Sequence, residues 1–317
     1  MNPKIKNVLI EVNKVIIGKE DIVKKVLMAL LSDGHVLLED VPGVGKTTMA
    51  LAYSKALGLD YKRIQFTPDV MPSDVQGFFY YNRQSNDFEF REGAVMTQIL
   101  LADELNRTSS RTQSALLEAM EEGQVTVDGS SYLLPQPFFV IATQNPTGSA
   151  GTQMLPQSQL DRFMVLLSMG YPSLKQEIAL MRDRGQGNPL DYVETILDAP
   201  TLLKIRQEVQ ETEISPLIYQ YIAMLAEATR RHELVEVGVS PRGSLALCRM
   251  AKAGAYLDER DYVIPEDVQA VVREVFGHRM ILKPRARLTE HITDEIIKEI
   301  LTSVSVPDVK NRRRGKL

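Results

Sequence analysis

One short stretch constrains the fold of this chain more than any other. Residues 40–47 read Asp-Val-Pro-Gly-Val-Gly-Lys-Thr, and they stand between an apolar run at 35–38 and a segment typical of a helix start at 48–53. A buried strand, a glycine-rich turn and a helix N-terminus direct backbone N–H groups at an anion, and the lysine of the turn reaches terminal phosphates. The expected cofactor-binding residues are Val41, Pro42, Gly43, Val44, Gly45, Lys46, Thr47 and Thr48.

The stretch departs from the P-loop pattern G-x-x-x-x-G-K-[ST] at one position, because Asp40 replaces the first glycine. An aspartate at the entry of the loop requires its own backbone geometry. The alternative interpretation is a chance Gly-Lys-Thr in a surface loop. The strand before the turn and the helix after it are the context that the motif requires, and they favour the phosphate-binding interpretation.

A second site supports the first. Residues 98–102 form an apolar run that ends in two carboxylates, Asp103 and Glu104. In a Walker B strand the first carboxylate holds Mg²⁺ together with the P-loop hydroxyl, here Thr47, and the second polarises the attacking water. An acidic strand end in solvent is the plainer alternative. Together the two sites predict an ATPase that uses ATP and Mg²⁺.

Composition excludes several classes of protein. The chain has 317 residues, 44% of them hydrophobic, and a net charge of -4, which gives no overall attraction to nucleic acid. No apolar run approaches the roughly 18 residues of a membrane span, and the N-terminus lacks the apolar core of a signal peptide. The single cysteine, Cys248, excludes an internal disulfide and fits a reducing compartment, so we expect a cytoplasmic protein.

The order of apolar segments predicts an α/β fold with a five-stranded parallel sheet. Continuous apolar runs alternate with helical patterns in the first half, which is typical of strands covered on both faces. The expected strands are 35–38, 62–66, 98–102, 138–143 and 163–169, and one expected helix covers 111–120 and ends near Gly123. After residue 172 the pattern is helical, including a helix from Pro265 to Phe276. We therefore expect a nucleotide-binding core at 1–172 and a small all-helical domain at 173–317.

Two inserts interrupt the predicted core. Residues 67–77 form a proline-punctuated loop, and residues 124–134 alternate around Asp128-Gly129, a strong signal for a hairpin. Both inserts could be ordinary surface decoration. The basic tail at 311–317 is interpreted as a frayed terminus rather than a nucleic-acid arm.

Further motifs appear in a fixed order along the chain. They are Ile16-Ile17-Gly18, Leu101-Ala102-Asp103-Glu104-Leu105-Asn106-Arg107, Ala142-Thr143-Gln144-Asn145-Pro146, an arginine at 162 and Val239-Ser240-Pro241-Arg242-Gly243. With the P-loop, these motifs resemble an AAA+ ATPase, and their wording resembles the MoxR family. The resemblance covers nearly the whole chain, and Asp40 is its one departure.

The resemblance implies a role for each matching residue. Asn145 matches sensor 1, which orients the water or senses the γ-phosphate. Arg162 matches the arginine finger, which enters the site of the neighbouring subunit, and Arg242 matches sensor 2, which reads the γ-phosphate across the cleft. Ile17 and Gly18 match the segment that packs on adenine. The inserts at 67–77 and 124–134 match the helix-2 insert and the pre-sensor-1 hairpin of the family.

The resemblance also implies partners. Proteins of this family form homo-oligomeric rings, usually hexamers, and act as chaperone-like ATPases on protein clients with von Willebrand factor A domains. Two other motors stay open, a helicase-type AAA+ motor and a magnesium-chelatase-type subunit. A strand-tracking hairpin would be basic and aromatic, whereas the hairpin at 124–134 contains no Lys or Arg. We therefore expect a protein client, no nucleic acid and no membrane span.

Overall fold

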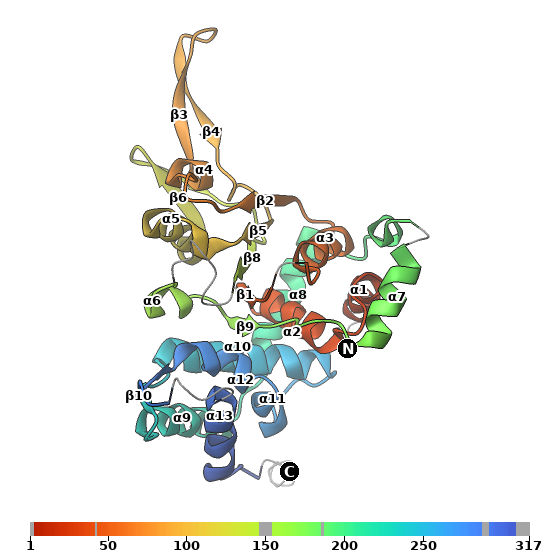
Figure 1. Cartoon of the computed structure of the whole chain (residues 1–317), viewed down its shortest axis with the longest axis vertical. Coiled ribbons are helices and arrows are strands. Elements are labelled where there is room, and N and C mark those ends of the chain that lie inside the picture. The colour runs from red at the N-terminus through yellow and green to blue at the C-terminus, as the bar shows by residue number, and fades with distance from the viewer. Residues whose placement is uncertain (1–2, 42, 146–153, 185–186, 287–291, 309–317) are drawn as a thin grey trace, which may run out of the picture.

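A computed structural model describes residues 3–41, 43–145, 154–184, 187–286 and 292–308 of the chain. Its centre is a five-stranded parallel sheet with the order β2-β5-β8-β1-β9 (Figure 1), which confirms the predicted α/β fold. The strands are β1 (Val36–Glu39), β2 (Tyr61–Gln65), β5 (Ile99–Asp103), β8 (Phe139–Gln144) and β9 (Val165–Leu167).

Two hydrophobic clusters cover the two faces of this sheet, because successive side chains of a strand point to opposite faces. Val36 and Leu38 belong to one cluster, which includes residues of three helices, and Leu37 belongs to the other. The three helices are α1 (Pro3–Asn13), α2 (Glu20–Leu31) and α3 (Lys46–Leu57). The second cluster contains the apolar side of α5 (Ser110–Glu122), which ends as predicted at Gly123 with a φ of 63°.

Two hairpins extend from the end of the molecule farthest from the C-terminal helices (Figure 1). The predicted hairpin is confirmed as β6 (Gln124–Val127) and β7 (Ser130–Leu133). The first insert continues beyond its predicted loop, because α4 (Pro72–Gln76) leads into a second hairpin of β3 (Gly77–Asn82) and β4 (Asp87–Glu92). The Phe90 ring stacks on the Tyr132 ring with centroids 4.1 Å apart, which joins the two hairpins.

The second half of the chain is mainly helical. Its long helices are α7 (Leu174–Arg184), α8 (Ala199–Glu211), α9 (Pro216–Arg231), α10 (Pro241–Leu257) and α13 (Ile292–Ser303). Its short elements, together with two from the core, are η1 (Leu105–Arg107), α6 (Gln157–Leu160), η2 (Pro189–Tyr192), α11 (Pro265–Gln269), α12 (Val272–Phe276) and η3 (Gly277–Arg279).

Two details of this half differ from the sequence analysis. The helix expected from Pro265 to Phe276 is divided into α11 and α12, because the backbone leaves helical geometry at Val271, with φ -127° and ψ -6°. Consecutive β-branched valines at 271 and 272 favour helix poorly. A small antiparallel pair, β10 (Val235–Val237) with β11 (Ile281–Leu282), accompanies the helices.

One hydrophobic cluster is continuous from the sheet into the second half. It contains residues of α1, α2 and α3 and also residues of α8, α9, α10 and α13. Polar contacts follow the same junction, since Lys25 pairs with Glu274 at 2.8 Å and Arg206 pairs with Asp33 at 2.7 Å. Within the described residues, no helix has the length and apolar character that crossing a bilayer requires. The basic tail at 311–317 lies outside the described residues.

Candidate nucleotide site

The P-loop turn has the backbone conformation that its glycines predict. β1 ends at Glu39 and α3 begins at Lys46, and between them Gly43 and Gly45 have φ values of 89° and 99°. Glycine adopts such positive φ values without the steric cost that other residues have. Gly45 is the N-cap of α3, and because it has no side chain it leaves the first N–H groups of the helix without a side-chain cap. Such a helix start is suited to bind a phosphate.

The remaining predicted residues of the turn surround this start. Thr47 and Thr48 follow Lys46 in the first turn of α3, Val41 precedes the glycines, and Val44 lies between them. Pro42 lies outside the described residues.

Lys46 lies at the centre of several negative groups. Its Nζ donates a hydrogen bond of 2.8 Å to the carbonyl oxygen of Asp40, and only 8% of the residue is exposed. Burial lowers the pKa of the Lys46 ammonium, and the charges of Asp40, Asp103 and Glu104 oppose this shift. Lys46 is therefore surrounded by the negative charges of Asp40, Asp103 and Glu104. A phosphate group could replace the Asp40 carbonyl oxygen as the hydrogen-bond partner of its ammonium.

The two predicted carboxylates stand at the end of β5, at the same edge of the sheet as the P-loop, with Asp103 as the last residue of the strand and Glu104 directly after it. Asp103 accepts a 2.7 Å hydrogen bond from the Thr143 hydroxyl and pairs with Arg63 at 2.6 Å. Among the residues that the structure describes, no group of three or more His, Cys, Asp or Glu could hold a metal ion.

Glu104 is held by three neighbouring side chains. Its carboxylate accepts hydrogen bonds from Asn145 Nδ2 at 3.1 Å, Gln65 Nε2 at 2.8 Å and Arg107 Nη1 at 2.9 Å. The residue itself has a φ of 57°, in the left-handed region that non-glycine residues rarely adopt. Backbone strain of this kind is concentrated at functional sites. The structure therefore brings Glu104 and Asn145 together, the two residues to which the motifs and the resemblance give roles on the attacking water.

Four residues of this edge received no role from the sequence. Gln65, Arg63 and Thr143 lie on β2 and β8, the strands on either side of β5. Arg107 is three residues after Glu104, a spacing that brings side chains together in a helical turn. Polar residues at the carboxyl ends of neighbouring strands were the available signal for the other three. The sequence does not give the strand order, so it could not pair them with Asp103 or Glu104.

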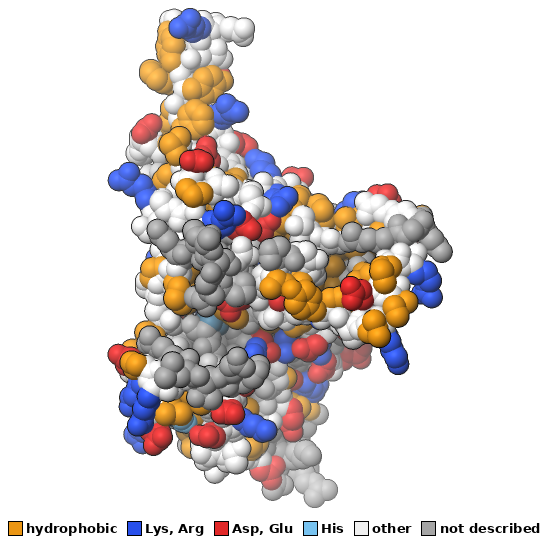
Figure 2. All heavy atoms as spheres, viewed as in Figure 1, with side chains coloured by type: hydrophobic (Ala, Val, Ile, Leu, Met, Phe, Trp, Pro, Cys, Tyr) orange, Lys and Arg blue, Asp and Glu red, His pale blue; other side chains and the backbone are white. Residues whose placement is uncertain are grey.

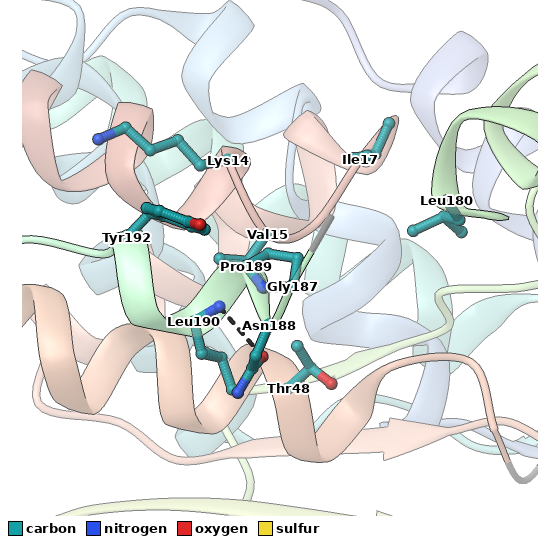
Figure 3. Close-up of a pocket in the computed structure, with 10 residues that line it drawn as sticks. All are labelled: Lys14, Val15, Ile17, Thr48, Leu180, Gly187, Asn188, Pro189, Leu190 and Tyr192. Carbon is teal, nitrogen blue, oxygen red and sulfur yellow. Dashed lines mark hydrogen bonds between the residues drawn. The ribbon is translucent and has the colours of Figure 1, made fainter. Parts of the chain in front are cut away.

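A pocket of about 600 Å³ opens beside the first turn of α3 (Figure 3). Ile17, Thr48, Leu180 and Tyr192 line it, and Figure 3 shows Ile17 and Leu180 on one side and Thr48 below them. Gly18 lies next to Ile17, and its carbonyl oxygen accepts a hydrogen bond of 3.0 Å from Gln176. A mostly apolar pocket next to a phosphate-binding turn fits a nucleotide base.

The two predicted arginines lie at the opposite edge of the sheet. Both pair with Glu121 near the end of α5: Arg162 Nε lies 3.3 Å from one carboxylate oxygen, and Arg242 binds the other. The preceding residue, Met120, accepts a hydrogen bond from His35 at the start of β1, whereas Lys46 follows the end of β1. In this structure Arg242 therefore stands with Arg162, away from its own P-loop, and its role in reading a phosphate stays a prediction.

A buried arginine, Arg279, connects the backbone around Arg162 with the helix that carries Arg242. Arg279 donates to the Asp161 carboxylate at 2.8 Å and to the carbonyl oxygens of residues 161, 163, 164 and 275, and 4% of it is exposed. The other Asp161 oxygen accepts from Ser240, the N-cap of α10, at 3.0 Å. The backbone around Arg162 and the helix start that carries Arg242 thus form one hydrogen-bonded unit.

Comparison with known proteins first identifies the class of protein to which this chain belongs. Residues 35–165 match the family described as "ATPase family associated with various cellular activities (AAA)", and residues 227–300 match the AAA lid domain. The crystal structure of a Cytophaga hutchinsonii protein superposes with a TM-score of 0.90 at 39% identity and covers 96% of each chain. The fold is that of an AAA+ ATPase with a helical lid.

The relatives then define the family. The chain is 48% identical to YeaC of Bacillus subtilis over 307 residues, which are 97% of this chain and 96% of that protein. It is 37% identical to the chaperone MoxR1 of Mycobacterium tuberculosis over 310 residues, which are 95% of this chain and 82% of the relative. The chain belongs to the MoxR family of AAA+ ATPases.

Proposed function

We propose that this protein binds ATP with Mg²⁺ and hydrolyses it. The observation that supports the proposal is the meeting of Lys46, Asp103, Glu104 and Asn145 at one edge of the sheet, beside an apolar pocket. ATP with Mg²⁺ supplies the phosphoryl group and the metal charge. Lys46, which donates to the Asp40 carbonyl in this structure, would bind a phosphate oxygen instead, and Thr47 and Asp103 would hold the metal. Glu104 polarises the attacking water while Asn145 orients it.

Two substitutions test this assignment. Lys46→Ala should weaken ATP binding by at least about tenfold, because it removes the charge directed at the phosphates. Glu104→Gln should keep ATP affinity and lower turnover by about 10²–10³-fold, because only activation of the water is lost. Phosphate release and calorimetric ATP affinity are measured on both variants. Wild-type turnover in Glu104→Gln would remove the assignment.

We further propose that hydrolysis needs an assembly of several copies. Arg162 and Arg242 lie together at the edge away from their own P-loop, so they are available to the site of a neighbouring copy. An arginine supplied in this way stabilises transition-state charge. A homo-oligomeric ring, of which a hexamer is the usual form, brings the two edges together. We also propose that the nucleotide-binding core ends at residue 172 and that the helical lid begins at residue 173.

The proposed partner is a protein client, which the chain would remodel or help to mature. A relative is named a chaperone, and the client class carried by the resemblance is a protein with a von Willebrand factor A domain. The hairpin of β3 and β4 exposes aromatic residues such as Phe88, yet residues 77–92 contain two arginines against three carboxylates. This balance disfavours the helicase alternative, because a hairpin that tracks nucleic acid would be basic.

The client proposal is tested by stimulation of ATPase activity. We expect a von Willebrand factor A domain protein to raise turnover at physiological salt, and single-stranded DNA or RNA to leave it unchanged. The same assay is repeated after deletion of residues 311–317 to remove the basic tail. Strong stimulation by nucleic acid in that shortened chain would favour a nucleic-acid motor instead.

A further inference from the structure

Asp40 makes contacts that the glycine of the P-loop pattern could not make. The residue is 4% exposed, and its carboxylate accepts three hydrogen bonds from the segment that follows β9. The donors are the Met169 N–H at 2.6 Å, the Gly170 N–H at 2.9 Å and the Ser168 hydroxyl at 2.8 Å. A buried carboxylate with three donors is a strong anchor, because hydrogen bonds to a charged acceptor are about twice as strong as neutral ones.

The anchored segment leads directly to one wall of the pocket. The carbonyl oxygen of Tyr171 accepts a hydrogen bond from Lys19 at 3.1 Å, and Gln176 of α7 donates to the Gly18 carbonyl. One turn further along α7, Leu180 lines the pocket, on the side away from Tyr192 in Figure 3. The wall is therefore connected to the P-loop through Asp40 and to the Ile17 segment through Gln176.

The helix α7 has little apolar packing to hold it by itself. Leu174, Ile178 and Met181 are 75%, 53% and 66% exposed, although their spacing places them on one side of the helix. Figure 2 shows exposed apolar side chains gathered in this part of the molecule. With so little burial, we expect the position of α7 to depend on the polar contacts that precede its first turn. Among the described residues, Asp40 is a buried acceptor of such contacts.

We propose that Asp40 is a positioning residue that fixes the segment 168–170 and so holds α7 as the base-side wall of the nucleotide pocket. The proposal rests on the proposed nucleotide binding. The Asp40 carboxylate holds the segment 168–170, which leads to the base side of the pocket. The Asp40 backbone carbonyl, a group that any residue has, accepts the hydrogen bond from Lys46. The two functions of this position can therefore be separated by changing the side chain alone.

The test compares two ligands in calorimetry. The variant is Asp40→Asn, and the ligands are ADP, which has a base, and inorganic tripolyphosphate, which has none. Hydrogen exchange is measured in parallel on the amides of 171–182. The matched control is Glu39→Gln, which also removes a carboxylate at this edge. The Glu39 carboxylate accepts its hydrogen bond from Gln144 on β8 and not from residues 168–170.

We expect Asp40→Asn to weaken ADP by about tenfold and to increase exchange in α7, because an amide cannot accept from all three donors. Tripolyphosphate should bind as well as before or more tightly, since a negative charge near Lys46 is removed. Glu39→Gln should leave ADP affinity within about twofold and exchange in α7 unchanged.

Several results would overturn the proposal. Unchanged ADP affinity and unchanged exchange in Asp40→Asn would do so, and so would equal weakening of ADP and tripolyphosphate. If Asp40→Asn does not fold, Ser168→Ala decides, because it removes one of the three donors: ADP affinity should fall about threefold, and no change would contradict the proposal. Absence of ADP binding in the wild-type protein would instead refute the proposed function, while exchange in α7 would still test the anchor.

Discussion

At the scale of single residues, His35 shows how the sheet fixes the state of a titratable group. The ring is buried between β1 and the end of α5, where Nδ1 accepts the Val140 N–H at 3.0 Å. Nε2 then carries the proton and donates to the Met120 carbonyl at 3.1 Å. A second proton would displace the Val140 hydrogen bond and place a charge in the core. Burial accordingly lowers the pKa of His35 to about 4.

This shift predicts a dependence of stability on pH. Because the pKa of His35 is lower in the folded state than its ordinary value of 6.5, the unfolded chain binds the proton more tightly. The stability that neutral His35 contributes should therefore be complete above pH 6.5. As the pH falls to 4, His35 alone should lower the free energy of unfolding by about 3 kcal/mol. Urea unfolding at pH 7.5 and pH 5 measures the larger part of this fall, about 2 kcal/mol.

The control separates His35 from other histidines. Burial also lowers the pKa of His278, so the wild-type protein carries two contributions of the same sign. In His35→Gln, whose amide can donate to Met120 and accept from Val140, the fall between the two pH values should be smaller than in the wild type. An equal fall in both proteins would show that His35 titrates normally.

At the scale of elements, Arg279 holds three segments in one unit. From η3, its guanidinium joins α12, the turn around Arg162 and, through Asp161, the start of α10. Removal of the side chain leaves the Asp161 carboxylate and several carbonyl oxygens without their donor. Loss of one partner of a buried pair costs about 3–5 kcal/mol.

We therefore expect Arg279→Ala to lower the free energy of unfolding by that amount in urea titrations. The matched control is Arg273→Ala, because Arg273 pairs with Asp294 at 2.8 Å but both side chains are about half exposed. Such surface pairs contribute roughly 0–1 kcal/mol. Similar losses in the two variants would mean that the Arg279 network adds no more than an exposed ion pair.

The elements also show what could be predicted from the sequence. Strands β1, β5 and β8 were predicted because each is a continuous apolar run that ends in polar residues, and their order along the chain identified the fold. The hairpin of β3 and β4 was not predicted. The insert was expected to end at residue 77, and the aromatic run at 78–81 that forms β3 begins directly after it. The contacts of Asp40 with residues 168–170 and of Arg242 with Glu121 join distant parts of the chain, which no local pattern encodes.

At the scale of the whole molecule, the two edges of the sheet divide the proposed machinery. Lys46 and Glu104 lie at one edge, and Arg162 lies at the other. Specific ATPase activity should therefore fall on dilution into monomers, because an arginine supplied by a neighbour contributes about 10³–10⁵ in rate. Sedimentation establishes the oligomeric state at each concentration.

Mixing two inactive variants tests the same division. A mixture of Arg162→Ala and Lys46→Ala should recover part of the hydrolysis, because one kind of contact between copies has an intact lysine and an intact arginine. Each variant alone serves as the control at the same total concentration. Full activity of Arg162→Ala alone, or constant activity through dilution to monomers, would contradict the arrangement.

The shared pairing of Arg162 and Arg242 with Glu121 has a consequence for the direction of communication. In a ring built as proposed, both arginines of one copy detect the nucleotide of the next copy, and their hydrogen-bonded unit includes the start of α10. Each lid then responds to the occupancy of its neighbour rather than to its own. The effect of hydrolysis would then pass around the ring in one direction, because the lid of each copy would respond to the nucleotide of one neighbour only.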